Sequence, residues 1–195
     1  MKRLAAILLA AGSSRRMGAA NKLLLPFGET TVLGRTLDTL LASAVDEVVV
    51  VLGHDALRVR QEIMGRKVII VENHDHENGM TGSIQAGVAA VSAGYGFLIC
   101  LADQVLLQTE QVNLLVDNWQ QASEDAIVLP QRQQRRGHPV IFSPCYREEI
   151  LALPPGDGCK SIVQSHFEHL VRIDVVENGF FADVDTPDDY TRLVP

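Results

Sequence analysis

The stretch LAAILLAAGSSRRMGAANK, residues 4–22, decides the fold of this chain. Its first part, 4–10, is uniformly apolar, as is typical of a strand that is buried on both faces of a parallel sheet. Gly12 then permits a sharp turn, and the loop beyond it carries hydroxyls and the positive charges of Arg16 and Lys22, which can hold phosphate oxygens. The segment therefore predicts a first strand that runs into a phosphate-binding loop.

The same stretch also has the outline of a secretory signal peptide, with Lys2 and Arg3 ahead of an apolar block. That block is short for such a signal, and Arg15 and Arg16 follow it where small, uncharged residues are expected. The cysteines also argue against an oxidising compartment, because their number is odd, none forms a CxxC pair and one lies in an apolar run: Cys100, Cys145 and Cys159. We therefore expect a strand here and a protein of the cytoplasm.

Length and charge limit the class of function. A chain of 195 residues predicts a single domain over residues 1–195. The formal net charge of −7 argues against nucleic acid or a membrane surface as a partner, because both attract positively charged proteins. No apolar run approaches the roughly 20 residues that a membrane-spanning helix needs.

Beyond the first loop, apolar runs alternate with segments of helical spacing. Strands are expected at 4–10, 47–53, 67–72, 97–103 and 125–130. Helices are expected at 31–42, 55–64 (capped by Asp55), 81–92 and 109–120. Buried strands separated by helices predict a mostly parallel sheet between two helical layers, which is a three-layer α/β fold of the Rossmann-like type.

The pattern changes after Pro130. A loop is expected to return into a short strand within 136–142. The segment FFADVDTPDDY, 180–190, predicts a strand and then a helix, in which Thr186 is the N-cap, Pro187 suits the first turn and Asp189 completes a capping box.

Ligands of open α/β sheets bind beyond the carboxyl ends of the strands. Asp103 follows the fourth of these strands, and Asp183 and Asp185 lie at the last, so we expect them to meet the first loop at one edge of the sheet. Carboxylates suit Mg²⁺, although Asp103 and Asp185 could instead cap the helices that follow them. Alternation along a strand places Asp183 and Asp185 on the same face, so periodicity does not choose between them.

The first loop matches a longer signature. It resembles that of the MobA-like nucleotidyltransferases, LAAGxSxRMGxxNK, here residues 9–22. Further blocks resemble this family in order: ENGMTGSIQAGV (77–88), LADQ (101–104), RGHPVIF (136–142), PGDGCKSI (155–162) and FADVDTPDDY (181–190). The resemblance covers essentially the whole chain and implies a sheet of the nucleotide-diphospho-sugar transferase type. Ala11 resembles the molybdenum cofactor cytidylyltransferase branch, because guanylyl-transferring relatives carry Gly at this place.

The resemblance implies an activity: transfer of CMP from CTP to the phosphate of molybdopterin cofactor, with release of pyrophosphate and with Mg²⁺ as the cofactor. Arg16, Lys22 and Asp103 would be catalytic, and Asp103 and Asp185 would bind the metal. The nucleotide would be held by Leu9, Ala10, Ala11, Gly12, Ser14, Lys22, Gly79, Met80, Thr81 and Ser83. His138 and Lys160 would contact the acceptor, and a molybdenum hydroxylase or its chaperone is a conceivable partner.

Some positions depart from the family pattern. Val105 stands where Pro is usual, Lys160 where Arg is common, and Gln85 where Arg or Lys is often found. Two other classes of function stay open: a nucleotidyltransferase that uses GTP or a sugar- or alcohol-phosphate acceptor, and a molybdenum cofactor chaperone without catalytic activity.

The HDHE segment and His138 each have two competing interpretations. The segment HDHE, 74–77, could suggest a metal site, but the close spacing of its histidines without a further ligand cluster favours a solvated loop. His138 lies between Gly137 and Pro139, and either a hydrogen bond to an acceptor phosphate or a role at an edge strand fits it equally.

Overall fold

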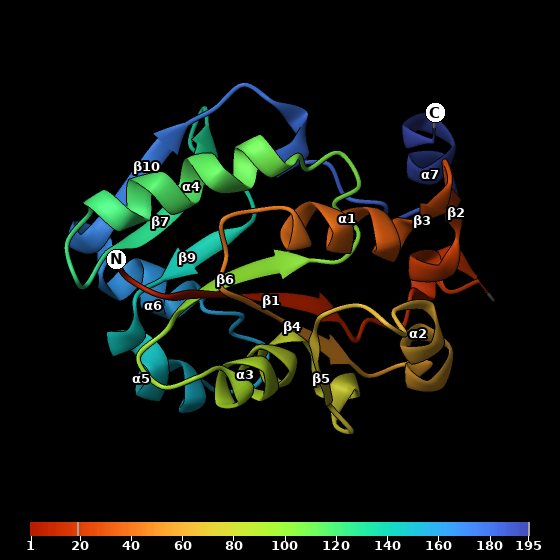
Figure 1. The fold of residues 1–195 in the computed structure, drawn as a ribbon, viewed down its shortest axis with the longest axis horizontal. Helices are drawn as coiled ribbons and strands as arrows, with labels where there is room; N and C mark the ends of the chain where they lie inside the picture. The colour runs from red at the N-terminus through yellow and green to blue at the C-terminus, as the bar shows by residue number, and fades with distance from the viewer. Residues whose placement is uncertain (19, 195) are drawn as a thin grey trace.

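The computed structural model describes residues 1–18 and 20–194 and places them around one large sheet (Figure 1). The order in this eight-stranded sheet is β10-β7-β9-β6-β1-β4-β5, and β8 pairs with β7. Its strands are β1 (Leu4–Ala10), β4 (Glu47–Leu52), β5 (Ile69–Glu72), β6 (Gly96–Leu101), β7 (Ile127–Arg132), β8 (Arg135–Arg136), β9 (Val140–Phe142) and β10 (Leu170–Asp174). The short strands β2 (Pro26–Phe27) and β3 (Thr30–Thr31) form a separate hairpin.

The centre of the sheet is parallel. β1 pairs in parallel with β4 on one side and with β6 on the other. The chain therefore leaves β1 toward β4 and β5 and later returns across β1 to form β6, which makes the β1–β6 boundary the point where the strand order reverses. Ligands of such sheets bind at this reversal, outside the carboxyl ends of the strands. β9 runs antiparallel between β6 and β7.

Helices cover both faces of the sheet. One core packs α1 (Val32–Leu41) and α4 (Thr109–Gln121) against one face through side chains such as Leu37 and Trp119. The other core packs α3 (Met80–Ala90), α5 (Arg147–Leu151) and α6 (Lys160–Ser165) against the opposite face, with α1 and α4 above the sheet and α3 and α5 below it in Figure 1. The expected three-layer α/β fold with a mostly parallel sheet is confirmed.

Most of the expected elements are present, and the differences lie at their ends and near the C-terminus. Asp55 does not cap α2 (Ala56–Glu62): its backbone is left-handed, with φ 57°, and its carboxylate accepts hydrogen bonds from Asn21 and Arg58 instead. The strand expected just before Thr186 is wrong, because Phe181 lies in a turn and residues 182–185 have no regular secondary structure and do not join the sheet. β10, α5 and α6 were not expected, since their patterns are short and only their packing stabilises them.

The helix at the C-terminus follows the expectation. α7 (Pro187–Leu193) begins after Thr186, whose hydroxyl accepts a hydrogen bond from the backbone N–H of Asp189 at 3.2 Å. The Asp189 carboxylate in turn accepts from the Thr186 N–H at 3.0 Å, which completes the capping box. In the part of the chain that the structure describes, no helix is long and apolar enough to cross a membrane.

Candidate active site

A cleft of about 560 Å³ opens at the carboxyl ends of β1 and β6, where the strand order reverses. Ten of the predicted site residues line it: Leu9, Ala11, Gly12, Arg16, Lys22, Gly79, Met80, Ser83, Asp103 and Asp185. The loop after β1, the start of α3, the end of β6 and the segment before α7 therefore meet around one space, as the topology requires.

The loop after β1 folds back on itself so that Lys22 reaches the cleft. Ser14 has a left-handed backbone, with φ 50°, and its Oγ accepts a hydrogen bond from the Lys22 N–H at 3.2 Å. Asn21 caps the short turn that follows by accepting from the Leu23 N–H at 3.1 Å. Ser14 thus supports the loop from within, whereas its neighbour Ser13 lines the cleft.

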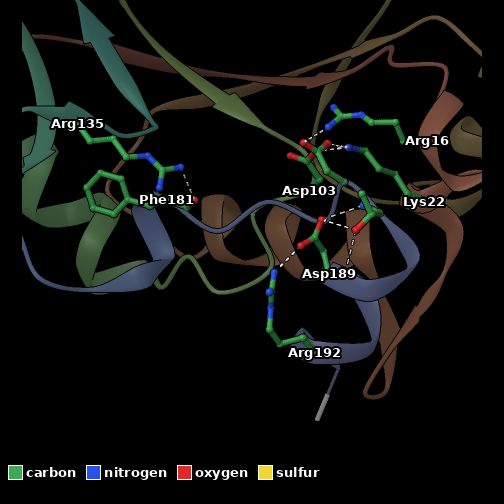
Figure 2. A network of polar contacts seen from close by, with 9 residues as sticks. Arg16, Lys22, Asp103, Arg135, Phe181, Asp189 and Arg192 are labelled. Atoms are coloured by element: carbon green, nitrogen blue, oxygen red, sulfur yellow. Dashed lines mark hydrogen bonds and ion pairs between the residues drawn. The ribbon is translucent and has the colours of Figure 1, made fainter.

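Basic side chains of this loop contact the acidic side chains on the far side of the cleft. Lys22 Nζ donates to Asp185 Oδ1 at 2.9 Å and to Asp103 Oδ2 at a shorter distance, and Arg16 pairs with Asp185 at 2.9 Å. In Figure 2, the Arg16 and Lys22 side chains point toward Asp103 from the same side. Burial acts to lower the pKa of Lys22, but the carboxylates of Asp103 and Asp185 outweigh burial and raise it. The ammonium therefore remains charged.

Three carboxylates share this small space. Burial, followed by the negative charges of Asp103 and Asp185, raises the pKa of Asp183 to about 6. Within residues 1–18 and 20–194, the buried Asp103 Oδ1 has no hydrogen-bond partner. Such an oxygen is costly unless a cation or ligand satisfies it. Arg16 and Lys22 pair with Asp103 and Asp185, whereas Asp183 forms no ion pair among the described residues, so the donor set fits a divalent ion that prefers oxygen ligands.

The structure distinguishes the two acids that periodicity left equal. The Val184 N–H donates to the Asp103 carbonyl at 3.1 Å, and the Val184 side chain is buried in the core. Asp183 and Asp185 therefore both face the cleft, although the segment is not a strand. Only Asp185 of this pair forms ion pairs with Arg16 and Lys22 among the described residues.

At the start of α3, the predicted nucleotide-binding residues fall into two groups. Gly79, Met80 and Ser83 line the cleft. Thr81 is 1% exposed, and its Oγ1 accepts a hydrogen bond from the Gly158 N–H at 3.0 Å. Thr81 therefore ties α3 to the PGDG loop, and the Thr81 side chain does not line the cleft. Ala10 is likewise buried beneath the loop, 1% exposed, outside the cleft lining.

The predicted acceptor residues lie in an adjoining hollow. His138 and Lys160 line a space of about 640 Å³, and Met80 lines both this hollow and the cleft. Burial lowers the pKa of His138, so its ring is neutral near neutral pH. The His138 Nδ1 atom is buried and has no hydrogen-bond partner among the described residues.

One departure from the family pattern, Gln85, has a structural role, as does Gln104 of the matching LADQ block. The Gln85 side-chain amide donates to the carbonyls of Ile150, Leu151 and Leu153 at 3.2, 3.0 and 3.0 Å, so it ties α3 to the end of α5. Gln104, which precedes Val105, donates to the His138 carbonyl at 3.3 Å and so links the end of β6 to the hollow.

Sequence reasoning missed several residues of the cleft. Ser13, Arg15, Leu23, His76, Glu77, Leu101 and Ala102 also line it, beside the predicted set and Asp183, which was expected as the alternative metal ligand. The solvated loop expected for HDHE fits His74, which is 84% exposed, and the exposed Glu77, whereas His76 is half-buried; both His76 and Glu77 line the cleft. Gly53 was missed as well: a Cβ atom there would lie 2.7 Å from the Cβ atoms of Ala11 and His76. Its place directly after β4, at the ligand edge of the sheet, was the available signal.

Comparisons with known proteins agree with this geometry. The chain is 32% identical to nicotine blue oxidoreductase of Paenarthrobacter nicotinovorans, over 96% of this chain and 95% of that protein. It is 27% identical to molybdenum cofactor cytidylyltransferase of Escherichia coli, over 94% and 92%. A Mycobacterium tuberculosis protein superimposes with a TM-score of 0.85 at 30% identity, covering 99% of this chain and 97% of that one. The same protein was solved in complex with manganese, with a TM-score of 0.80 at 28% identity and 98% coverage of both chains. The model of the MobA-like NTP transferase domain matches residues 6–170, and the chain belongs to this family of nucleotidyltransferases.

Proposed function

We propose that this chain transfers the cytidylyl group of CTP to the phosphate of molybdopterin cofactor. An oxygen of the cofactor's terminal phosphate would attack the α-phosphorus of CTP, the bond from that phosphorus to the β-phosphate oxygen would break, and pyrophosphate would leave. The nucleophile is already an anion, so the protein needs to align two anions and neutralise charge rather than remove a proton. The observation that carries this proposal is the pairing of Lys22 and Arg16 with Asp103 and Asp185 at the carboxyl edge of the sheet.

Asp103 and Asp185 would hold the divalent ion, for which we propose Mg²⁺. The ion would reduce repulsion between the two phosphates and stabilise the charge on pyrophosphate. Lys22 and Arg16 would then contact triphosphate oxygens, since both side chains line the cleft and carry fixed positive charge. Backbone N–H groups of the loop around Gly12 are suited to the same oxygens.

The base and the acceptor would lie on opposite sides of Met80. Ala11 lines the cleft and is 6% exposed, so its methyl group would narrow the space offered to a base and favour a pyrimidine. Gly79 and Ser83 would contact the base or ribose. The phosphate of molybdopterin would approach from the hollow of His138 and Lys160, where Lys160 would supply charge and the His138 ring a hydrogen bond. The cytoplasm would be the compartment, and a molybdenum hydroxylase or its chaperone would receive the product.

A direct assay tests the proposal. The protein is incubated with molybdopterin cofactor, Mg²⁺ and each nucleoside triphosphate in turn, and pyrophosphate and the cofactor dinucleotide are measured. We expect release with CTP and its loss in Asp103→Ala, because removing a metal ligand costs several kcal/mol of transition-state stabilisation. Asp188→Asn is the matched control, since Asp188 is an exposed acid outside the cleft lining.

The assay also separates the competing functions. GTP use, or transfer to a sugar or alcohol phosphate, would keep the nucleotidyltransferase activity but replace CTP or molybdopterin as the proposed substrate. Cofactor binding without pyrophosphate release would favour a chaperone. The relative named nicotine blue oxidoreductase is 32% identical, so reduction of nicotine blue with NADPH or NADH as the electron donor is measured in parallel, and turnover there without pyrophosphate release would favour an oxidoreductase.

A further inference from the structure

A cluster of histidine and carboxylate side chains lies at the end of the sheet opposite the cleft. His166, Glu168 and His169 each offer a ligand atom, and these atoms all lie within 4.8 Å of one another. The cluster sits just before β10, near the start of β7 and the end of the antiparallel strand β9. These are the amino ends of the parallel strands, whereas the cleft lies at their carboxyl ends. In Figure 1, α6, which leads into the cluster, lies at the side of the N-terminus and far from α7.

A buried tyrosine fixes the proton on one of the two imidazole rings. The Tyr146 hydroxyl donates its only proton to the Asp125 carbonyl at 2.8 Å, and it lies 2.8 Å from His169 Nδ1. Because that proton is already used, the tyrosine oxygen accepts from Nδ1, so Nδ1 carries the hydrogen. Tyr146 is 3% exposed, and a phenol carries its proton at neutral pH. In the neutral imidazole, the lone pair therefore belongs to Nε2.

That lone pair points into a negatively charged environment. His169 Nε2 lies 3.3 Å from Asp125 Oδ2 and 3.9 Å from Glu168 Oε1. On the neighbouring ring, His166 Nε2 lies 2.9 Å from Glu149 Oε2. A nitrogen lone pair and carboxylate oxygens repel one another at such distances unless a proton or a metal ion lies between them.

Cationic side chains do not resolve this repulsion. Within residues 1–18 and 20–194, the ion pairs of Asp125, Glu149 and Glu168 are formed with the two histidines and not with lysine or arginine. Lys2, which comes from the neighbouring N-terminal segment, donates to the carbonyls of Trp119, Ala122 and Ser123 instead. The cluster therefore has an excess of negative charge and an imidazole lone pair directed into it.

We propose that His166, Glu168 and His169 bind a divalent ion of the zinc class, with Asp125, Glu149 or water completing the coordination. Two imidazoles and a carboxylate form a donor set that zinc accepts, and imidazole ligands distinguish this site from the all-oxygen set of the cleft. Tyr146 would act as the outer partner that fixes the His169 tautomer, an arrangement that tunes many metal-ligating histidines. The histidine side chains are 29% and 30% exposed, so an ion can enter from solvent.

Metal titrations of the full chain test the site. Excess Mg²⁺ is kept present to occupy the oxygen ligands of the cleft, and Co²⁺ is added while its visible absorption is recorded. Zn²⁺ is then used to displace Co²⁺, which gives its relative affinity. We expect one equivalent of Co²⁺ with nitrogen-ligand absorption, and its displacement by Zn²⁺.

Variants locate the bound ion. His166→Gln and His169→Gln are expected to abolish the Co²⁺ absorption, and Tyr146→Phe to weaken binding by about tenfold or more. His74→Gln is the matched control, because His74 is an exposed histidine outside the cluster and should bind as the wild type does. Circular dichroism checks that each variant is folded, and a fold lost in His169→Gln leaves His166→Gln as the deciding variant. No Co²⁺ absorption in the wild type, or equal absorption in His166→Gln and His74→Gln, would overturn the proposal.

Discussion

Replacing Lys22 by methionine tests how the cleft balances its charges before substrate arrives. Lys22 Nζ lies between Asp103 and Asp185, the two carboxylates proposed to bind the metal, at 2.9 Å from Asp185 Oδ1. The ammonium thus occupies the place where the ion would neutralise these acids. Because triphosphate oxygens offer Lys22 another partner, we expect metal and nucleotide to bind cooperatively in the wild type.

The loss of stability expected in Lys22→Met follows from the burial of the Lys22–Asp185 ion pair. Two unit charges at 2.9 Å attract by about 6 kcal/mol at an effective dielectric constant of about 20, before desolvation is subtracted. Removing one partner of a fully buried pair costs about 3–5 kcal/mol, and the partial exposure of Asp185 reduces this to about 2–3 kcal/mol for Lys22→Met. Arg16 is 67% exposed, so Arg16→Met should lower the free energy of unfolding by only about 0–1 kcal/mol.

Lys22→Met should lower stability but raise the affinity for metal. Without Lys22, the acids face one another with less positive charge, so Mn²⁺ should bind them more tightly in the absence of nucleotide, by about tenfold or more (about 1.4 kcal/mol). CTP should bind more weakly, since a triphosphate contact is lost. Urea unfolding gives the stability, electron paramagnetic resonance gives free Mn²⁺, and isothermal titration gives CTP affinity.

Two results would refute this reasoning. One is a free energy of unfolding for Lys22→Met that equals that of Arg16→Met, which would mean that the buried ion pair contributes no more than the exposed one. The other is Mn²⁺ affinity that falls in Lys22→Met without nucleotide, which would mean that Lys22 does not compete with the metal.

Three further substitutions test residues in or next to the cleft and the adjoining hollow. Ala11→Gly should raise the kcat/KM of GTP relative to CTP by about 5- to 150-fold, because relief of steric crowding is worth about 1–3 kcal/mol. Competitive kinetics measure the ratio, and an unchanged ratio would remove Ala11 from base selection. Gly53→Ala should lower the free energy of unfolding by about 1–3 kcal/mol and weaken CTP binding, because the added Cβ would lie 2.7 Å from the Cβ of Ala11. The control is Gly82→Ala, inside α3, where the added Cβ would lie 3.4 Å from the nearest atom, so its stability in urea unfolding should be equal or higher. Burial lowers the pKa of His138 below its ordinary 6.5, so the unfolded chain binds the proton more readily; stability is therefore present above that value and is lost as pH falls below it. Unfolding between about pH 5.5 and 7.5 should then show a smaller acid-induced loss for His138→Gln than for the wild type, and equal losses would contradict the assignment.

The sequence by itself determined the order of buried strands and helices, because burial on both faces requires uninterrupted apolar runs such as 4–10 and 97–101. It also brought the loop after β1 and Asp103 to one edge, since parallel strands place their carboxyl ends together. The Asp183–Asp185 segment is not a strand and reaches this edge through the hydrogen bond of the Val184 N–H to the Asp103 carbonyl. Local hydrogen bonding settled the start of α7, where Thr186 and Asp189 cap each other within one turn.

Only the tertiary structure decided how these residues divide their work. Asp185 rather than Asp183 pairs with Lys22 and Arg16, and the Val184 N–H between the two acids donates to the Asp103 carbonyl. These are contacts between segments that are far apart in sequence. Thr81 accepts a hydrogen bond from the PGDG loop instead of facing the cleft, and His76 packs against Gly53. These contacts also join segments that are distant in sequence. Such contacts depend on strand register and helix packing, which no local pattern encodes; the sequence therefore specifies which groups reach the ligand edge, and through-space packing specifies which of them meet.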